Sequence, residues 1–155
     1  MRADSLRALE ARWHDEIPIT GTMGVRVHAF DGHTLEIIAA LAPNLNIHGT
    51  AFAGSLFSVA ALCGWGQVYL QLEAAGLAGS IVFVEGRIRC LAPARADMLA
   101  GSAWTQSAAE QLDRLRTQDR TRVHLDTQVT CDGTLVADFS GEYGVRLTDA
   151  PQRSR

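Results

Sequence analysis

The chain has 155 residues and a formal net charge of −3 at pH 7, with 47% hydrophobic and 20% charged residues. This composition excludes a disordered chain, and the length fits one domain with a core that needs no disulfide or metal. No basic block is present, so we expect no nucleic-acid partner. The charged N-terminus has no apolar segment of the kind found in secretory signals, which predicts a cytoplasmic location.

A helix and two strands are predicted at the start of the chain. Pro18 should end the helix, and residues 19–24 should form a loop. Alternating residues over 25–29 predict a half-buried strand, Asp-Gly at 31–32 predicts a tight turn, and residues 35–41 predict a second strand. The helix is indicated by apolar residues at spacings of three and four: Leu6, Leu9, Trp13 and Ile17.

Residues 43–72 form the stretch around which the chain is organised. No charge occurs between residues 51 and 70, so a helix here must be buried on all sides, in protein or in lipid. Glycines and Gln67 interrupt the run, and no Lys or Arg flanks it closely, which argues against a membrane span. We therefore predict a central helix enclosed by a sheet, and no membrane partner.

The strand after this helix is predicted at residues 80–91. Its alternation predicts Val82, Val84, Ile88 and Cys90 on one face, and Glu85, Arg87 and Arg89 on the other. The three cysteines are scattered and form no CxxC pair, so we expect buried, reduced thiols and no metal site.

The remaining chain predicts three more strands and one short helix. The strands are expected at residues 97–104, 121–130 and 135–147, with a hairpin turn at Asp132-Gly133. Ser107 and Glu110 have capping-box spacing, which predicts a helix over residues 108–116. Residues 149–155 are expected to be a frayed tail. Strands joined by short connections around one apolar helix indicate an α+β fold with an antiparallel, curved sheet.

Three segments carry a resemblance to a known family. They are the helix entry HGTAFAGSL at residues 48–56, the GWG at residues 64–66, and RIRCLAPA at residues 87–94. Together with the element order, they resemble the hotdog fold and, within it, a family of thioesterases that also occurs as the C-terminal domain of a bacterial acetyltransferase protein. The likeness covers roughly residues 17–147 of what we expect to be one domain, 1–155.

The resemblance implies an enzyme that acts on acyl groups carried by coenzyme A or acyl carrier protein. It implies a homodimer joined edge to edge through its sheets, or a homotetramer formed by two such dimers. The acyl site would lie at the subunit interface near the start of the central helix. No cofactor is implied, since coenzyme A is part of the substrate.

The residues at the helix entry suggest how such a site could work. Backbone N–H groups of Ala53 and Gly54 at a helix start could stabilise an oxyanion, and Gly54 would allow close approach of a thioester. Asn46 and His48 are candidate catalytic side chains, although both residue types also organise loops. The other candidates for substrate binding are Gly49, Thr50, Phe52, Ser55 and Ser58.

The helix contains no Asp or Glu before Glu73, so it lacks the catalytic aspartate found in one large group of hotdog thioesterases. Glu85 is the replacement candidate for a general base, with an ion pair as the alternative. Arg87 and Arg89 could bind the phosphates of coenzyme A, or be solvated strand charges.

Two other functions remain open on the sequence. The missing carboxylate favours a non-catalytic acyl-CoA-binding protein. An enoyl-CoA hydratase is the other possibility, because residues 44–48 partly match a hydratase motif. Asn44 stands where that motif has an aspartate.

Overall fold

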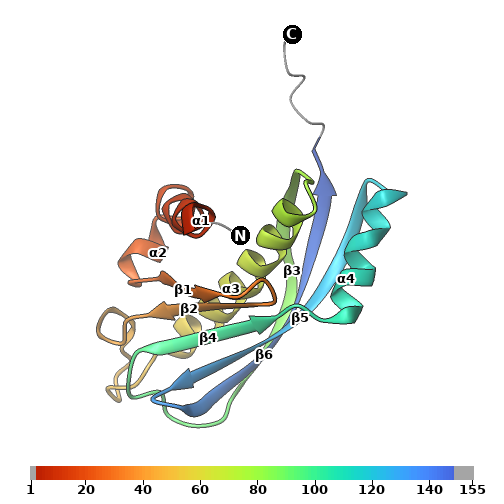
Figure 1. Cartoon of the computed structure of the whole chain (residues 1–155). Helices are drawn as coiled ribbons and strands as arrows, with labels where there is room; N and C mark the ends of the chain where they lie inside the picture. The colour runs from red at the N-terminus through yellow and green to blue at the C-terminus, as the bar shows by residue number, and fades with distance from the viewer. Residues whose placement is uncertain (1–2, 149–155) are drawn as a thin grey trace.

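The computed structural model describes residues 3–148 as one antiparallel sheet with a long helix against it (Figure 1). The strand order in the sheet is β1-β2-β4-β5-β6-β3. The helices are α1 (Ala3–Glu16), α2 (Ile19–Thr22), α3 (Ala53–Ala74) and α4 (Gln106–Asp113), with 3-10 turns η1 (Ala42–Asn44) and η2 (Arg114–Arg116). The strands are β1 (Arg26–Phe30), β2 (Thr34–Ala39), β3 (Gly79–Cys90), β4 (Met98–Ala103), β5 (Arg120–Cys131) and β6 (Thr134–Leu147). The predicted α+β arrangement is confirmed.

Helix α3 packs along the face of the sheet that we call the inner face. Val59, Cys63 and Leu70 on α3 are completely buried. The hydroxyl of Tyr143 on β6 donates a hydrogen bond of 2.9 Å to the carbonyl oxygen of Ala61. By length and hydropathy alone α3 could span a bilayer, with a mean hydropathy of 1.2 in a window that is 50% buried. Its contacts with five strands of the sheet account for its apolar composition.

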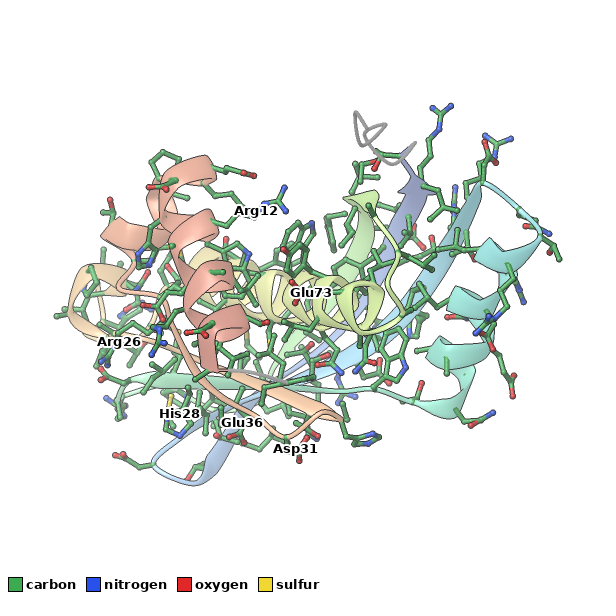
Figure 2. All side chains as sticks on the ribbon, turned by 45° about the horizontal axis from the view of Figure 1, so that its top comes forward. Arg12, Arg26, His28, Asp31, Glu36 and Glu73 are labelled. Carbon is green, nitrogen blue, oxygen red and sulfur yellow. The ribbon has the colours of Figure 1, made fainter. Side chains whose placement is uncertain are left out.

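Helix α1 lies across α3 and covers part of the core. Trp13 is 1% exposed and meets α3 at Gly66, where a side chain would collide with the indole. Figure 2 shows Arg12 on α1 reaching toward α3, where its guanidinium carbon lies 5.3 Å from the Tyr69 ring centroid. The predicted loop at residues 19–24 is wrong in part, because α2 begins directly after Pro18. Proline at a helix start loses no hydrogen bond, so Pro18 ends one helix and begins another.

Strand β3 contains a bulge that changes the predicted faces. Phe83 pairs with Tyr143 and Glu85 pairs with Glu142, so Val84 is the extra residue. The prediction that Val82 and Val84 share a face with Ile88 is therefore wrong. Both valines lie against Gly144 on the outer face, the side of the sheet away from α3.

The second half of the chain confirms most of the predicted elements. The Asp132-Gly133 hairpin has positive φ at both residues, 48° and 78°, as a tight primed turn requires. Helix α4 begins two residues earlier than predicted, because the cap is Thr105 rather than Ser107. The Thr105 hydroxyl accepts a hydrogen bond of 3.1 Å from the N–H of Ala108. The predicted tail at 149–155 lies outside the described residues.

Candidate active site at the start of helix α3

The loop before α3 is anchored by Asn44. This residue is 3% exposed, and its side-chain nitrogen donates to the carbonyl oxygens of Met23 and Ala40 at 2.9 and 2.6 Å. Its own carbonyl oxygen accepts from the N–H of Phe52 at 2.7 Å, which fixes the approach of the chain to the helix. Asn44 stands where the hydratase motif has its aspartate, and its burial leaves no route by which it could meet a substrate.

Asn46 closes the tip of the same loop. Its side-chain oxygen accepts from the N–H groups of His48 and Thr50 at 2.9 and 3.1 Å. Its side-chain nitrogen donates to the Thr50 hydroxyl at 2.9 Å and to the Ala51 carbonyl at 3.4 Å. Two donors and two acceptors are the full capacity of an amide side chain. Asn46 therefore holds the loop shape, and no hydrogen-bonding position on it is left for a substrate.

The loop presents His48 and Gly49 to solvent. Gly49 has φ +72°, a conformation that glycine adopts without strain. His48 is exposed, and its ring makes no hydrogen bond with any described residue. Of the two predicted catalytic side chains in this loop, His48 is the one whose polar atoms are free.

Helix α3 begins with unsatisfied backbone donors. Its N-cap is Phe52, whose side chain cannot accept a hydrogen bond. The N–H groups of Ser55 and Leu56 bond back to the Phe52 carbonyl at 3.0 and 3.1 Å. The N–H groups of Ala53 and Gly54 have no acceptor among residues 3–148. Free N–H groups at the positive end of a 22-residue helix favour a negative charge at this point.

A pocket of about 390 Å³ opens beside these donors. One wall is the helix start, and the other is the segment that follows β3, which is tied to the loop by a hydrogen bond of 2.8 Å from Ala51 N–H to the Ala94 carbonyl. The sequence predictions missed the second wall, although it belongs to the RIRCLAPA segment. The lining residues are Asn46, Thr50, Ala51, Ala53, Leu56, Cys90, Leu91, Ala92, Pro93 and Ala94.

The space above Gly54 is occupied by the ring of Phe52. A side chain on Gly54 would collide with that ring. The Phe52 side chain is 56% exposed, so the ring can turn away without leaving a cavity in the core. The predicted close approach of a ligand to Gly54 therefore requires Phe52 to move.

The two serines of the helix entry show no nucleophile geometry. The Ser58 hydroxyl donates to the Gly54 carbonyl at 2.8 Å, a bond within the helix. Ser55 is half-buried, and its hydroxyl makes no hydrogen bond with any described histidine or carboxylate. Neither serine has the adjacent base that a nucleophilic hydroxyl needs.

The predicted strand residues lie away from this pocket within one chain. Glu85 and Arg87 are register partners of Glu142 and Ser140, which alternate with the inward-facing Tyr143. Their side chains therefore face outward, on the opposite side of the sheet from α3. Arg89, opposite Asp138, belongs to the same outer face and lines a hollow of about 650 Å³ there with Arg87. One chain does not bring Glu85 together with Asn46 and His48.

A serine, a histidine and an aspartate meet on the outer face, but not as a nucleophilic triad. The Ser140 hydroxyl donates to the Asp126 carboxylate at 2.7 Å and lies 2.9 Å from Nε2 of His124. Because the hydroxyl proton is directed at Asp126, Nε2 must donate to the serine oxygen. His124 therefore cannot accept the serine proton in this arrangement, as triad chemistry requires.

Cys63 and Cys90 occupy opposite environments. Cys63 is completely buried in α3, and burial raises the pKa of its thiol far above the ordinary value. The prediction of a buried thiol is wrong for Cys90, which is exposed and lines the pocket. It is the last residue of β3.

Comparison with known proteins agrees with this geometry. The chain is 35% identical to a putative thioesterase of Shewanella oneidensis, with a TM-score of 0.87 over 95% of this chain and 100% of that one. It is 27% identical to a protein of unknown function from Chlorobaculum tepidum, with a TM-score of 0.88 over 93% and 95%. A Haemophilus influenzae thioesterase shares the fold alone, at 13% identity and a TM-score of 0.74 over 96% and 94%.

The six-stranded antiparallel sheet, the long inner helix and these similarities define a hotdog-fold protein of the thioesterase type. The model of the putative thioesterase family, described as the yiiD C-terminal domain, matches residues 6–147. The chain belongs to this family.

Proposed function

We propose that the protein hydrolyses thioesters of acyl-CoA or acyl carrier protein in the pocket at the start of α3. The main support for this proposal is the pair of unsatisfied N–H groups on Ala53 and Gly54, which lie beside a pocket with an apolar wall. A thioester carbonyl oxygen seated there would gain hydrogen bonds as it becomes an oxyanion. One such donor contributes roughly 3 kcal/mol to the transition state in a well-measured case.

The site is proposed to be completed by a second copy of the chain. Strand β3 forms one edge of the sheet, so one row of its backbone groups has no strand partner among residues 3–148. Phe83 on this edge and Leu91 just after it are large apolar side chains that are exposed, at 40% and 44%. A homodimer paired along β3 would cover them and bring the partner's strand to the pocket rim, and two such dimers would form a tetramer.

The attacking water needs a base, and His48 is the proposed one. It lies on the loop that shapes the pocket, and its ring is unpaired among the described residues, so a ring nitrogen is free to accept a proton from water. Glu85 remains a prediction for the same role, from a partner subunit only. Arg87 and Arg89 remain predictions for phosphate binding.

The experiment is the release of free thiol from acyl-CoA substrates of several chain lengths, measured for wild type, His48→Ala and Glu85→Gln. Loss of a general base lowers the rate by about 10² to 10⁴. We expect this loss for His48→Ala and not for Glu85→Gln. Equal rates for all three proteins would remove His48 as the base, and no hydrolysis by wild type would remove the enzyme assignment.

A non-catalytic acyl-CoA-binding protein is the second candidate, because no carboxylate lines the pocket. For a binding protein, acyl-CoA should raise the melting temperature while no thiol is released. For an enzyme, thiol should be released.

A further inference from the structure

The outer face carries a groove that the proposed hydrolysis does not use. It has a volume of about 780 Å³, within the range of small-molecule sites. It lies beyond the bulge of β3, at the Ser80 end of that strand, whereas the candidate active site lies at the Cys90 end. Its walls come from β3, β5, β6 and the α4–η2 segment, which Figure 1 shows beside β5.

The groove is strongly basic in a chain whose net charge is −3. Of the described residues, four arginines and one carboxylate, that of Glu142, line it. Glu142 already pairs with Arg122 at 3.0 Å. The other three, Arg114, Arg120 and Arg146, have no carboxylate within ion-pair distance among residues 3–148.

Two of these arginines are held directly opposite each other. Arg120 and Arg146 are register partners on β5 and β6. Like charges at directly opposite positions of a sheet destabilise it. A bound anion between them would remove this repulsion, and guanidinium groups match phosphate oxygens in geometry.

The third arginine is positioned by a helix that is fastened to the sheet edge. The side-chain oxygen of Gln111 on α4 accepts from the N–H of His124 at 2.8 Å, and its carbonyl accepts from the Thr121 hydroxyl at 2.7 Å. These bonds fix the end of α4, from which Arg114 follows directly along the chain. The hydrogen bonds that hold α4 therefore fix the backbone position of Arg114 at the groove.

The floor of the groove is hollow and partly apolar. Gly144 has no side chain, and a Cβ there would lie 3.2 Å from Val82 and 3.3 Å from Val84. The two valines, 59% and 40% exposed, form a wall beside the arginines. A flat apolar group can lie against them while an attached phosphate meets the guanidinium groups.

We propose that this groove binds a phosphorylated nucleotide, with its phosphates on Arg120, Arg146 and Arg114 and its base against Val82 and Val84. The same chemistry occurs at the nucleotide end of coenzyme A and in free nucleotides. The site is independent of whether the chain hydrolyses thioesters.

The test is calorimetric titration of the full chain with adenosine 3′,5′-bisphosphate, coenzyme A, adenosine and inorganic pyrophosphate. The variant Arg120→Ala/Arg146→Ala is compared with Arg7→Ala/Arg26→Ala, which removes the same charge at exposed positions on α1 and β1, away from the groove. We expect the first variant to bind the bisphosphate about tenfold more weakly or worse, since charge-assisted bonds are lost. The second should bind within about twofold of wild type. Thermal melting checks that both variants fold.

The outcomes separate the alternatives. Coenzyme A binding as tightly as the bisphosphate identifies the coenzyme as the source, whereas binding of the free nucleotide alone identifies a separate ligand; both support the site. Pyrophosphate binding as tightly as the bisphosphate would overturn the nucleotide assignment. An equal loss in both variants, or no loss in Arg120→Ala/Arg146→Ala, would overturn the groove itself.

Discussion

The ring of Phe52 lies over Gly54, in the space where any other residue would have its side chain. The two residues are the N-cap and the second residue of α3, next to the free N–H groups of the candidate site. A ligand that uses the Gly54 N–H must displace an exposed aromatic ring, so this contact links entry into the pocket to the motion of one side chain.

Gly54→Ala should therefore impair function far more than folding. The new methyl group pushes the Phe52 ring aside and holds the thioester away from the N–H group. A misplacement of about 1 Å costs roughly 100-fold in rate, so kcat/KM for acyl-CoA should fall by about that factor. Because the ring is exposed and alanine favours helix, the free energy of unfolding should change by less than about 1 kcal/mol. Urea denaturation and thiol release measure the two effects.

Gly21→Ala is the matched control, since no heavy atom lies within 4 Å of its added methyl group. Both rate and stability should match wild type. Full activity in Gly54→Ala would show that the substrate does not approach this part of the helix.

Asn46→Ala should destabilise the chain as well as reduce hydrolysis. The substitution removes four side-chain hydrogen bonds that close the loop at residues 46–51. Because the loop is partly exposed, we expect a loss of about 1–3 kcal/mol in the free energy of unfolding, measured by urea denaturation. Asn46→Asp keeps the accepting oxygen and should lose less. A variant with unchanged stability and no activity would instead place Asn46 in contact with the substrate.

The fold was largely predictable because its signals are local or compositional. An uncharged run of twenty residues must be buried, and that alone predicts the environment of α3. Asp132 and Gly133 tolerate positive φ, so the hairpin follows from two residues. The bulge at Val84 has no such signal, since it depends on how β3 pairs with β6.

The site was less predictable, because it depends on contacts between distant segments. Asn46 was identified as a catalytic candidate, but only the closed loop shows that its amide is fully occupied. Glu85 follows an apolar run that suggested burial, whereas the edge position of β3 leaves it exposed on the outer face. Cys90 alternates as a buried residue, yet it is exposed at the end of its strand and lines the pocket.

Gly64→Ala should be severely destabilising. A methyl group there would collide with the hydroxyl and ring of Tyr143, which is completely buried and bonded to Ala61. The ring has no free space to enter, so we expect a loss of about 3 kcal/mol in the free energy of unfolding. Denaturant titration measures it, and Gly101→Ala is the control, because its nearest neighbour atom would be 3.9 Å away. A cost below about 1 kcal/mol would show that the packing between α3 and β6 is loose.

Val84→Lys should weaken self-association if two copies pair along β3. A lysine on an exposed strand edge opposes pairing with another edge. We expect the molar mass from light scattering to fall toward that of one chain at a concentration where wild type is a dimer. Ile19→Lys, at a 63% exposed position on α2, is the control and should not change the molar mass. A wild-type protein that is monomeric at all concentrations would contradict the interface.

Alkylation should distinguish Cys90 from the other thiols and test the pocket at the same time. Burial raises the pKa of Cys63 and of Cys131, so both should stay protonated and unreactive in the folded chain. Cys90 is exposed, so mass spectrometry should find one label per chain, on Cys90. Because Cys90 lines the pocket, a bulky maleimide there should lower kcat/KM by about tenfold or more through misplacement of the substrate.

Cys90→Ser should take no label and keep its activity after the same treatment. A labelled wild type with full activity would show that the thioester does not occupy this pocket.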